Sequence, residues 1–275
     1  MLRLSISLLA VLGFSCVAIA QQNPTESGTA SVQPASETCA FTFSSGTGHG
    51  VTQYCVTENG NIAQFSAVGG NGLPWEFLNG VNPAIEGYGL CDTTSAPLKA
   101  YWDYAANAGG NWKAATATAN DTTVTVTRTT ADGVWQLVQT ITELKGSAKL
   151  YGAARIAMAI TNLSKNDRFL IVDRYANIDA GSSTFNDFDL TQTTVFGLVP
   201  AGNGPGLSST VSFVTTPFDF SIAFVNKVPH GPIPCQAHPN FTTSFFEGDG
   251  GIDQEFNLEI GPGKTKTVVL TYKPI

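Results

Sequence analysis

Short segments in which apolar and polar side chains alternate recur along most of the chain, with Gly, Asn and Pro between them. The clearest pair is TVTVTRTT at residues 123–130 and VWQLVQTITEL at 134–144, joined by Ala131-Asp132-Gly133. A repeat of two residues is that of a β-strand with one buried side, and helical periodicity is nearly absent. We therefore predict an all-β fold, a large antiparallel β-sandwich with few or no helices.

The same pattern places other strands and turns. Long strands are predicted over residues 149–162 and 169–176, and a hairpin is predicted to turn at 58–61, where Asn-Gly supplies the positive φ angles of a tight turn. A last hairpin is predicted to join 256–260 to 265–273. No fixed-period repeat stands out, which argues against a propeller or a solenoid.

The first twenty residues have the pattern of an export signal. Arg3 precedes an apolar run over residues 4–17, and small residues follow at 18 and 20, where a signal peptidase reads the chain. We predict that residues 1–20 are removed and that the protein is secreted, to the periplasm or the extracellular space. A lipoprotein signal that uses Cys16 is the alternative. The run is too short to span a bilayer and no later window is longer, so no transmembrane span is predicted.

Composition then bounds the mature chain. Residues 21–37 hold no aromatic residue and one Val, so we predict a disordered tether, followed by a single domain over 38–275. The formal net charge is −7, which disfavours nucleic acid as a partner. The sequence has no GxSxG, HExxH or phosphate-binding Gly-Lys motif.

Four cysteines remain after the predicted signal, and an oxidising destination favours disulfides over metal binding. Three pairings are open in principle. If a hairpin pairs Phe43 with Val51, Cys39 lies directly opposite Cys55, so the register favours that bridge. The remaining two are Cys91 and Cys235.

Several short motifs carry a resemblance to a group of secreted bacterial β-proteins for which we know no established activity. They are Tyr54-Cys55-Val56-Thr57 with Asn59-Gly60-Asn61-Ile62, then Glu86-Gly87-Tyr88-Gly89-Leu90-Cys91-Asp92, then Arg174-Tyr175 with Asp179. The likeness covers about residues 39–273. It implies the disulfide pattern more than it implies a chemistry.

A second likeness concerns the fold. The early hairpin, the middle segment over residues 142–179 and the closing strand after Gly261-Pro262-Gly263 look similar to the supersandwich of galactose-mutarotase-like domains. Such domains bind or process sugars, and the catalytic ones use a His acid and a Glu base. The resemblance implies candidates of these types in His230, His238, Glu247, Glu255 and Glu259.

Aromatic and acidic residues gather between positions 86 and 112. Exposed rings beside carboxylates suit a sugar, because the rings support its C–H face and the carboxylates accept its hydroxyls. The candidate ligand-binding residues are Tyr88, Tyr101, Trp102, Trp112 and, from the Pro-rich loop at 227–240, His230. Glu86 and Asp103 are the candidate catalytic pair. The alternative for each ring is core packing, and for the histidine a surface position.

A calcium site is a further candidate. Asp179, Asp187 and Asp189 crowd a strand end and its loop, and Ca²⁺ prefers such oxygen ligands. The alternative is an ordinary Asx turn, in which case no cofactor is needed. Taken together, the residues favour a protein that binds carbohydrate or another extracellular or cell-surface ligand. The alternative is a carbohydrate-active hydrolase, lyase or epimerase that uses a carboxylate pair or a Glu/His pair.

Overall fold

The computed structural model describes residues 39–45, 51–68, 74–79, 86–104, 107–108, 110–147, 151–179, 186–190, 194–198, 206–211, 220–228 and 231–275. The predicted signal peptide and the tether lie outside these residues and remain predictions. No helix in the described residues is long and apolar enough to cross a membrane.

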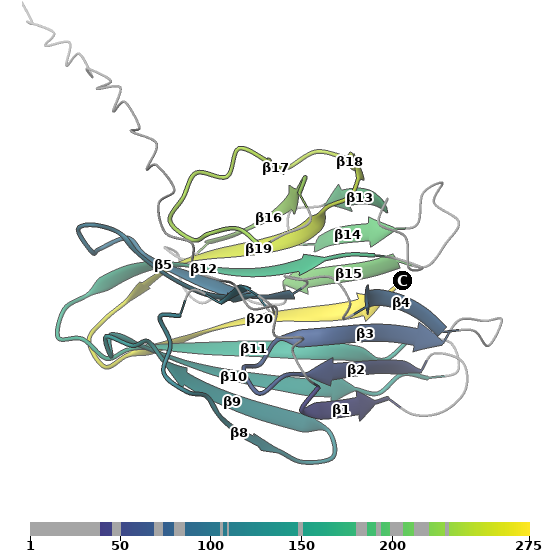
Figure 1. Cartoon of the computed structure of the whole chain (residues 1–275), viewed down its shortest axis with the longest axis horizontal. Coiled ribbons are helices and arrows are strands. Elements are labelled where there is room, and N and C mark those ends of the chain that lie inside the picture. Colours follow the sequence, from purple (N-terminus) through teal and green to yellow (C-terminus); the bar gives the residue numbers. More distant parts are fainter. Residues whose placement is uncertain are drawn as a thin grey trace, which may run out of the picture. The chain divides into compact units, whose positions relative to one another are not determined.

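The described residues form twenty strands and no helix, in three antiparallel sheets (Figure 1). A four-stranded sheet contains β1 (Phe41–Ser44), β2 (Thr52–Val56), β3 (Ile62–Val68) and β4 (Pro74–Asn79). A nine-stranded sheet runs in the order β18 (Phe246–Gly248), β13 (Asn186–Leu190), β14 (Thr194–Leu198), β15 (Gly206–Val211), β20 (Thr265–Pro274), β11 (Ala153–Asn162), β10 (Trp135–Leu144), β9 (Thr123–Thr129) and β8 (Thr116–Ala119). A seven-stranded sheet runs in the order β17 (Phe241–Thr242), β16 (Phe220–Asn226), β19 (Gly251–Ile260), β12 (Arg168–Asn177), β5 (Glu86–Asp92), β6 (Lys99–Tyr104) and β7 (Asn107–Ala108). The predicted all-β sandwich class is confirmed.

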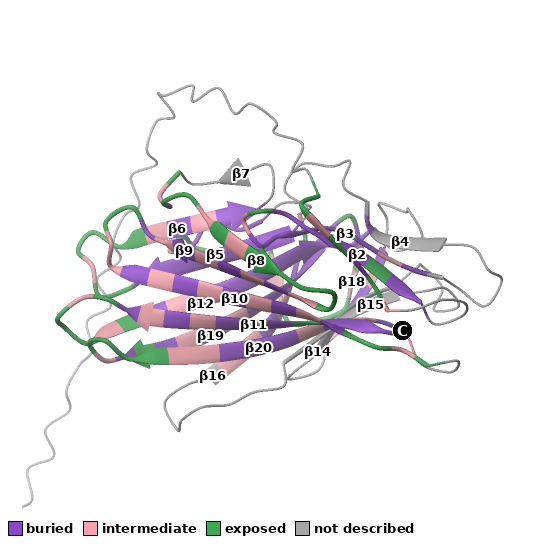
Figure 2. Cartoon of the chain, turned by 90° about the horizontal axis from the view of Figure 1, so that it is seen from below, coloured by how far each residue is buried: buried purple, intermediate pink, exposed green. Residues whose placement is uncertain are grey.

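One hydrophobic core is shared by the three sheets. Alternate residues of β10 and β11 are buried, as the bands along these strands show (Figure 2). In the seven-stranded sheet, Leu170, Val172, Leu90, Phe256 and Leu258 belong to the same core. We call the side of this sheet that carries them its inner face, and the opposite side its outer face. Because side chains alternate along a strand, the neighbours of these residues point to the outer face.

Two of the predicted hairpins form and one does not. β9 pairs with β10 and β2 pairs with β3, as predicted. The prediction of a C-terminal hairpin was wrong, because β19 and β20 do not pair with each other. β19 pairs with β12 and β16, and β20 pairs with β11 and β15. The apolar residues of β19 and β20 enter the same core from two different sheets. The turn at residues 261–264 therefore joins two sheets instead of two paired strands.

Both disulfides form, Cys39–Cys55 and Cys91–Cys235. The hairpin register that favoured the first bridge was nevertheless wrong. Phe43 pairs with Tyr54 and not with Val51, and Cys39 lies before the first residue of β1. This register stacks the rings of Phe43 and Tyr54 at 5.1 Å, a contact that residue alternation alone does not reveal.

Candidate functional site

The inner face of the seven-stranded sheet carries buried carboxylates that are each neutralised by an arginine. Glu86, on β5, is fully buried and receives Nε and Nη2 of Arg174 at 2.5 and 2.9 Å. The backbone N–H of Ile62 and the hydroxyl of Tyr272 also donate to Glu86, at 2.6 and 3.1 Å. Burial raises the pKa of the Glu86 carboxyl, and Arg174 opposes that rise. This arrangement fixes β5 and β12 to the opposite sheet.

Asp103 and Asp92 repeat the pattern. Asp103, on β6, is fully buried and forms an ion pair with Arg128 of β9, and Asn61 donates to it at 2.6 Å. Asp92 forms an ion pair with Arg168 at 2.5 Å. Removing one partner of such a pair would leave an uncompensated buried charge. The inner-face carboxylates therefore hold the sheets together.

The predicted catalytic pair and most of the predicted ligand-binding rings lie in this interior. Glu86 and Asp103 have no exposed surface, so neither carboxylate reaches an open site in this structure. Tyr88 and Tyr101 each pack edge to face against Trp112 in the core, at centroid distances of 5.6 and 6.2 Å. In this structure these three rings pack in the core, which is the alternative to ligand binding given in the sequence analysis.

The outer face differs in its charges. Asp173 of β12 and Glu255 of β19 lie directly opposite each other, and Asp253 lies opposite Tyr175 one step along the same pair of strands. None of the three carboxylates forms an ion pair with a lysine or arginine among the residues that the structure describes. We call Asp173, Asp253 and Glu255 the outer acidic cluster.

Tyr104 links β6 to this cluster across β5. Its hydroxyl donates a short hydrogen bond to Asp173, and its ring lies edge to face with Tyr175 at 6.1 Å. The strand between them carries Gly89, where an added Cβ would lie 2.1 Å from Asp173 Oδ1 and 2.6 Å from the Tyr104 hydroxyl. Only glycine leaves room for that hydrogen bond.

Asp253 is the most unusual member of the cluster. It is fully buried, and neither of its carboxylate oxygens has a hydrogen-bond partner. The backbone N–H of the next residue, Gln254, favours the ionised form of the carboxyl, but the loss of water outweighs it. Burial, together with the charges of Asp173 and Glu255, holds the pKa of Asp253 well above its usual range. An ionised carboxylate in this position would be costly, so Asp253 holds a proton more tightly than an exposed aspartate does.

The other two carboxyls also hold protons more tightly than usual. Burial raises the pKa of Asp173 to about 7; the hydrogen bond from Tyr104 opposes the rise and the charge of Glu255 adds to it. Burial also raises the pKa of Glu255. A carboxyl that titrates near pH 7 can donate or accept a proton, which is what general acid–base catalysis requires.

A strap over residues 231–241 crosses the outer face. The Cys91–Cys235 disulfide ties it to β5, and Pro234 lies against Gly89. At its far end His238 stacks on Phe241 at 4.5 Å, with Nε2 4.0 Å from Glu255 Oε1. Burial lowers the pKa of His238, so the ring is neutral at pH 7. The strap therefore buries the cluster on one side and leaves Glu255 half-buried.

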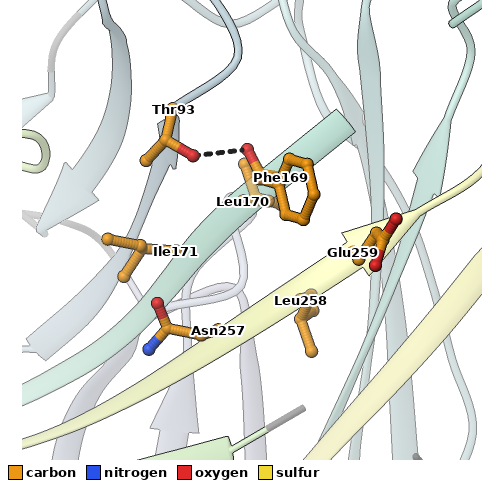
Figure 3. A pocket seen from close by; sticks show the side chains of 7 residues that line it. All are labelled: Thr93, Phe169, Leu170, Ile171, Asn257, Leu258 and Glu259. Atoms are coloured by element: carbon orange, nitrogen blue, oxygen red, sulfur yellow. Dashed lines mark hydrogen bonds between the residues drawn. The ribbon is translucent and has the colours of Figure 1, made fainter. Parts of the chain in front are cut away.

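A groove of about 380 Å³ adjoins the cluster on the outer face. Thr93, Phe169, Leu170, Ile171, Asn257, Leu258 and Glu259 line it (Figure 3). The Phe169 ring is 53% exposed, which is unusual for an aromatic side chain on a strand. The register pairs Phe169 with Glu259, Ile171 with Asn257, and then Asp173 with Glu255. The groove thus ends where the outer acidic cluster begins.

The remaining predicted residues have separate positions. Trp102 lies on the outer face and packs against Tyr104 and Tyr175, with no hydrogen-bond partner for its buried Nε1. His230 lies outside the described residues. Asp179 is buried at the end of β12, whereas Asp187 and Asp189 lie on β13. In the described part of the chain no three His, Cys, Asp or Glu side chains are grouped to hold a metal ion, so the structure does not gather these aspartates into a calcium site.

Of the residues implied by the sugar-domain resemblance, His238 and Glu255 are the two that the described structure brings together. Sequence reasoning missed Asp253, Phe169, Ile171 and Asn257. For Asp253 and Asn257 the signal was the alternation in β19, where positions 253, 255, 257 and 259 hold acidic or amide side chains and the positions between them, except Gln254, are apolar.

Comparisons with known proteins concern the fold. No protein-family model matches the chain, and no curated protein is similar to it in sequence. Among solved structures, a polysaccharide lyase aligns with a TM-score of 0.50 and 11% identity, over 83% of this chain and 33% of its own. A bacterial glucoamylase solved with acarbose gives 0.47 and 8%, over 87% and 32%, and a galactose mutarotase-like protein from Lactobacillus casei gives 0.43 and 10%, over 86% and 100%. This chain spans about a third of the length of the lyase and of the glucoamylase.

Proposed function

We propose that the outer face of the seven-stranded sheet is a carbohydrate-active site: the groove binds a saccharide, and the outer acidic cluster transfers a proton on it. The observation that carries the proposal is the cluster itself, three carboxylates that form no ion pair with a lysine or arginine among the described residues, next to an open groove. Inner-face carboxylates of the same sheet are each paired with an arginine. The fold shared with a polysaccharide lyase supports a saccharide as the ligand class.

The chemistry of the groove also supports a saccharide. Phe169 and Ile171 offer an apolar surface, while Asn257, Glu259 and Thr93 place an amide, a carboxylate and a hydroxyl around it. A pyranose has an apolar C–H face and a rim of hydroxyls, so it needs both kinds of contact at once. The Thr93 hydroxyl already donates to the backbone carbonyl of Phe169 at 3.1 Å, which fixes that side of the groove.

The roles within the cluster follow from exposure. Glu255 is half-buried and is the next outward residue on β19 after Asn257 of the groove, so we assign to it the contact with the saccharide and the role of proton acceptor. Asp173 is 4% exposed, is held in place by Tyr104 and has a pKa of about 7, so it can give up a proton near neutral pH. One ionised and one protonated carboxyl are the two partners that acid–base catalysis on a sugar needs.

Binding is tested with a glycan array and with titration calorimetry on the saccharides that it identifies. Phe169→Ala should weaken binding at least about tenfold, because the apolar platform is lost. Phe245→Ala is the matched control, since its ring is 61% exposed outside the groove. The binding proposal fails if no saccharide binds, or if both variants bind as the native protein does.

Catalysis is tested on the saccharides that bind, by following reducing ends, unsaturated products and anomeric exchange. Glu255→Gln should lower kcat about a hundredfold or more with little change in affinity, because a positioned acid or base contributes about that much. Glu247→Gln, an exposed glutamate on β18, is the control. Native turnover in Glu255→Gln would remove the catalytic role of this residue.

A binding protein without turnover is the second candidate. It is favoured by one observation, the burial of Asp173 and Asp253 beneath the strap, which keeps both carboxyls from a ligand in the groove. Saccharide binding that depends on Phe169, without turnover of any bound saccharide, would establish that candidate.

A further inference from the structure

The nine-stranded sheet ends in β8, a strand whose outer edge is open (Figure 1). β8 pairs with β9 on one side and with no other described strand, and Thr116, Thr118 and Ala119 are exposed. The other terminal strands of the two large sheets, β7, β17 and β18, have only two or three residues each. An open edge presents a row of unpaired N–H and C=O groups to which another strand can bind.

β8 also lacks the features that usually protect an edge. Its four residues are Thr and Ala, with no charge and no proline, and its register with β9 contains no bulge. Charged side chains, proline and bulges are the means by which edge strands avoid pairing. The charges lie just outside the strand: Lys113 precedes it and Asp121 follows it, both exposed, and neither forms an ion pair among the residues that the structure describes.

The hydrogen bonds of β8 determine which residues face its open edge. The N–H of Asn120 donates to the carbonyl of Thr123 at 2.9 Å, so the backbone groups of residue 120 point toward β9. This orientation alternates along a strand, so Ala117 and Ala119 present their N–H and C=O groups to the open edge. A strand that adds to β8 therefore pairs with these two residues.

We infer that a second copy of this chain binds this edge, antiparallel, through its own β8 and about a two-fold axis at Ala117. In such an isologous contact each residue lies opposite its mirror position in the other copy. Ala117 lies opposite the second copy's Ala117, with the outward N–H and C=O groups of both paired, and Ala119 lies opposite Ala115. The same register places Lys113 opposite Asp121 of the second copy, once at each end of the contact.

Charge complementarity favours a second copy in this register over other partners. A shift by one residue would place an outward backbone group against an inward one, so the shift is excluded. Shifts by two residues keep the hydrogen bonds but bring Lys113 opposite residue 119 or 123, and neither is acidic. An unrelated strand would satisfy the backbone of β8 without pairing the two charges that flank it.

The contact is small, so the association is weak. One short strand from each copy gives an interface well below about 1,200 Å², and we expect a Kd between about 10 µM and 1 mM. Protein at about 1 µM is then a monomer. The inference does not depend on the proposed function, because β8 belongs to the nine-stranded sheet and the groove lies on the seven-stranded one.

The test is analytical ultracentrifugation at low salt, over protein concentrations from about 5 µM to 1 mM. Lys113→Asp and Asp121→Lys each place like charges opposite each other at both ends, so each variant should dimerise at least about tenfold more weakly. A mixture of the two variants should associate as the native protein does, because each acidic end then meets a basic one. Lys165→Asp, at an exposed position between β11 and β12, is the control and should leave association unchanged.

A backbone variant tests the hydrogen bonds of the edge separately. Ala117→Pro removes an N–H that points away from β9, so the pairing of β8 with β9 is kept, as is usual for proline on an edge strand. This variant should be a monomer throughout the concentration range. Thermal unfolding of each variant establishes that it is folded, and the charge variants carry the test if Ala117→Pro does not fold.

Three results would overturn the inference. The first is a native protein that remains monomeric at about 1 mM and low salt. The second is a dimer that neither charge reversal weakens, because such a dimer uses another surface. The third is a mixture of the two reversal variants that associates no better than either variant alone. None of these measurements involves a saccharide, so the inference and the proposed function fail independently.

Discussion

Replacing Asp173 by Asn should make the protein more stable at neutral pH, and the gain should depend on pH. Asp173 is buried on the outer face and accepts a hydrogen bond from Tyr104, which an amide oxygen can also accept. The substitution therefore keeps the shape and the hydrogen bond from Tyr104 and removes the ionisable group. The amide nitrogen cannot accept the backbone N–H of Gly89, and this loss offsets a part of the gain.

The size of the effect follows from the pKa of Asp173. Folding raises it from an ordinary 3.8 to about 7, so the folded protein binds this proton more tightly than the unfolded chain does. The stabilising contribution is complete below about pH 3.8 and is lost as the pH rises to 7. A difference of one in pKa corresponds to about 1.36 kcal/mol. The free energy of unfolding of the native protein therefore falls by about 4 kcal/mol between low pH and pH 8 because of this group.

Urea unfolding with both disulfides intact, at pH 4, 5.5, 7 and 8, measures the difference between native protein and Asp173→Asn. We expect a small difference at pH 4 that grows in favour of the variant by about 4 kcal/mol at pH 8. Asp121→Asn, in an exposed turn, should show no such trend. A difference that is constant with pH, or that favours the native protein as pH rises, would refute the reasoning.

Three other substitutions test the remaining structure. Glu86→Gln leaves its arginine buried without a counter-charge and should lower the free energy of unfolding by about 3–5 kcal/mol; a loss below about 1 kcal/mol would contradict the inner-face account. Gly89→Ala puts a Cβ 2.1 Å from an oxygen of Asp173 and should destabilise by about 1–3 kcal/mol, whereas native stability would mean that the strand shifts freely. Replacing Cys91 and Cys235 by Ser removes a bridge across 144 positions and should cost about 2–5 kcal/mol, with faster proteolysis of the strap as the second readout; unchanged cleavage would show that the disulfide does not hold the strap.

The fold class was predictable because alternation is a local property. The pattern at residues 123–144 predicts both arms of β9 and β10 and their turn, and the structure contains them. The sheet that a strand joins is not determined by its local sequence. Residues 256–273 have the pattern of two apolar strands joined by a turn, and this pattern fits a hairpin as well as a connection between two sheets. The core that decides between them includes Val172 and Leu137, which are distant in the sequence.

The candidate site was predictable only in part. Residue types pointed to carboxylates and aromatic rings, but the face of the sheet on which each lies decides its role. Glu86 and Asp103 point inward to arginines of β12 and β9, and no spacing in the sequence reveals those partners. The alternation Asp173-Arg174-Tyr175 does separate the two faces, and read in that way it would have placed Asp173 outside.

The most direct measurement of the central claim is a nuclear magnetic resonance titration of the ¹⁵N-labelled protein with the saccharides that the glycan array identifies. If the outer face of the seven-stranded sheet is the site, the largest amide shift changes will occur at Phe169, Ile171, Asn257 and Glu255, which lie side by side on β12 and β19. Changes confined to the four-stranded or the nine-stranded sheet, with these four amides unmoved at saturation, would contradict the account.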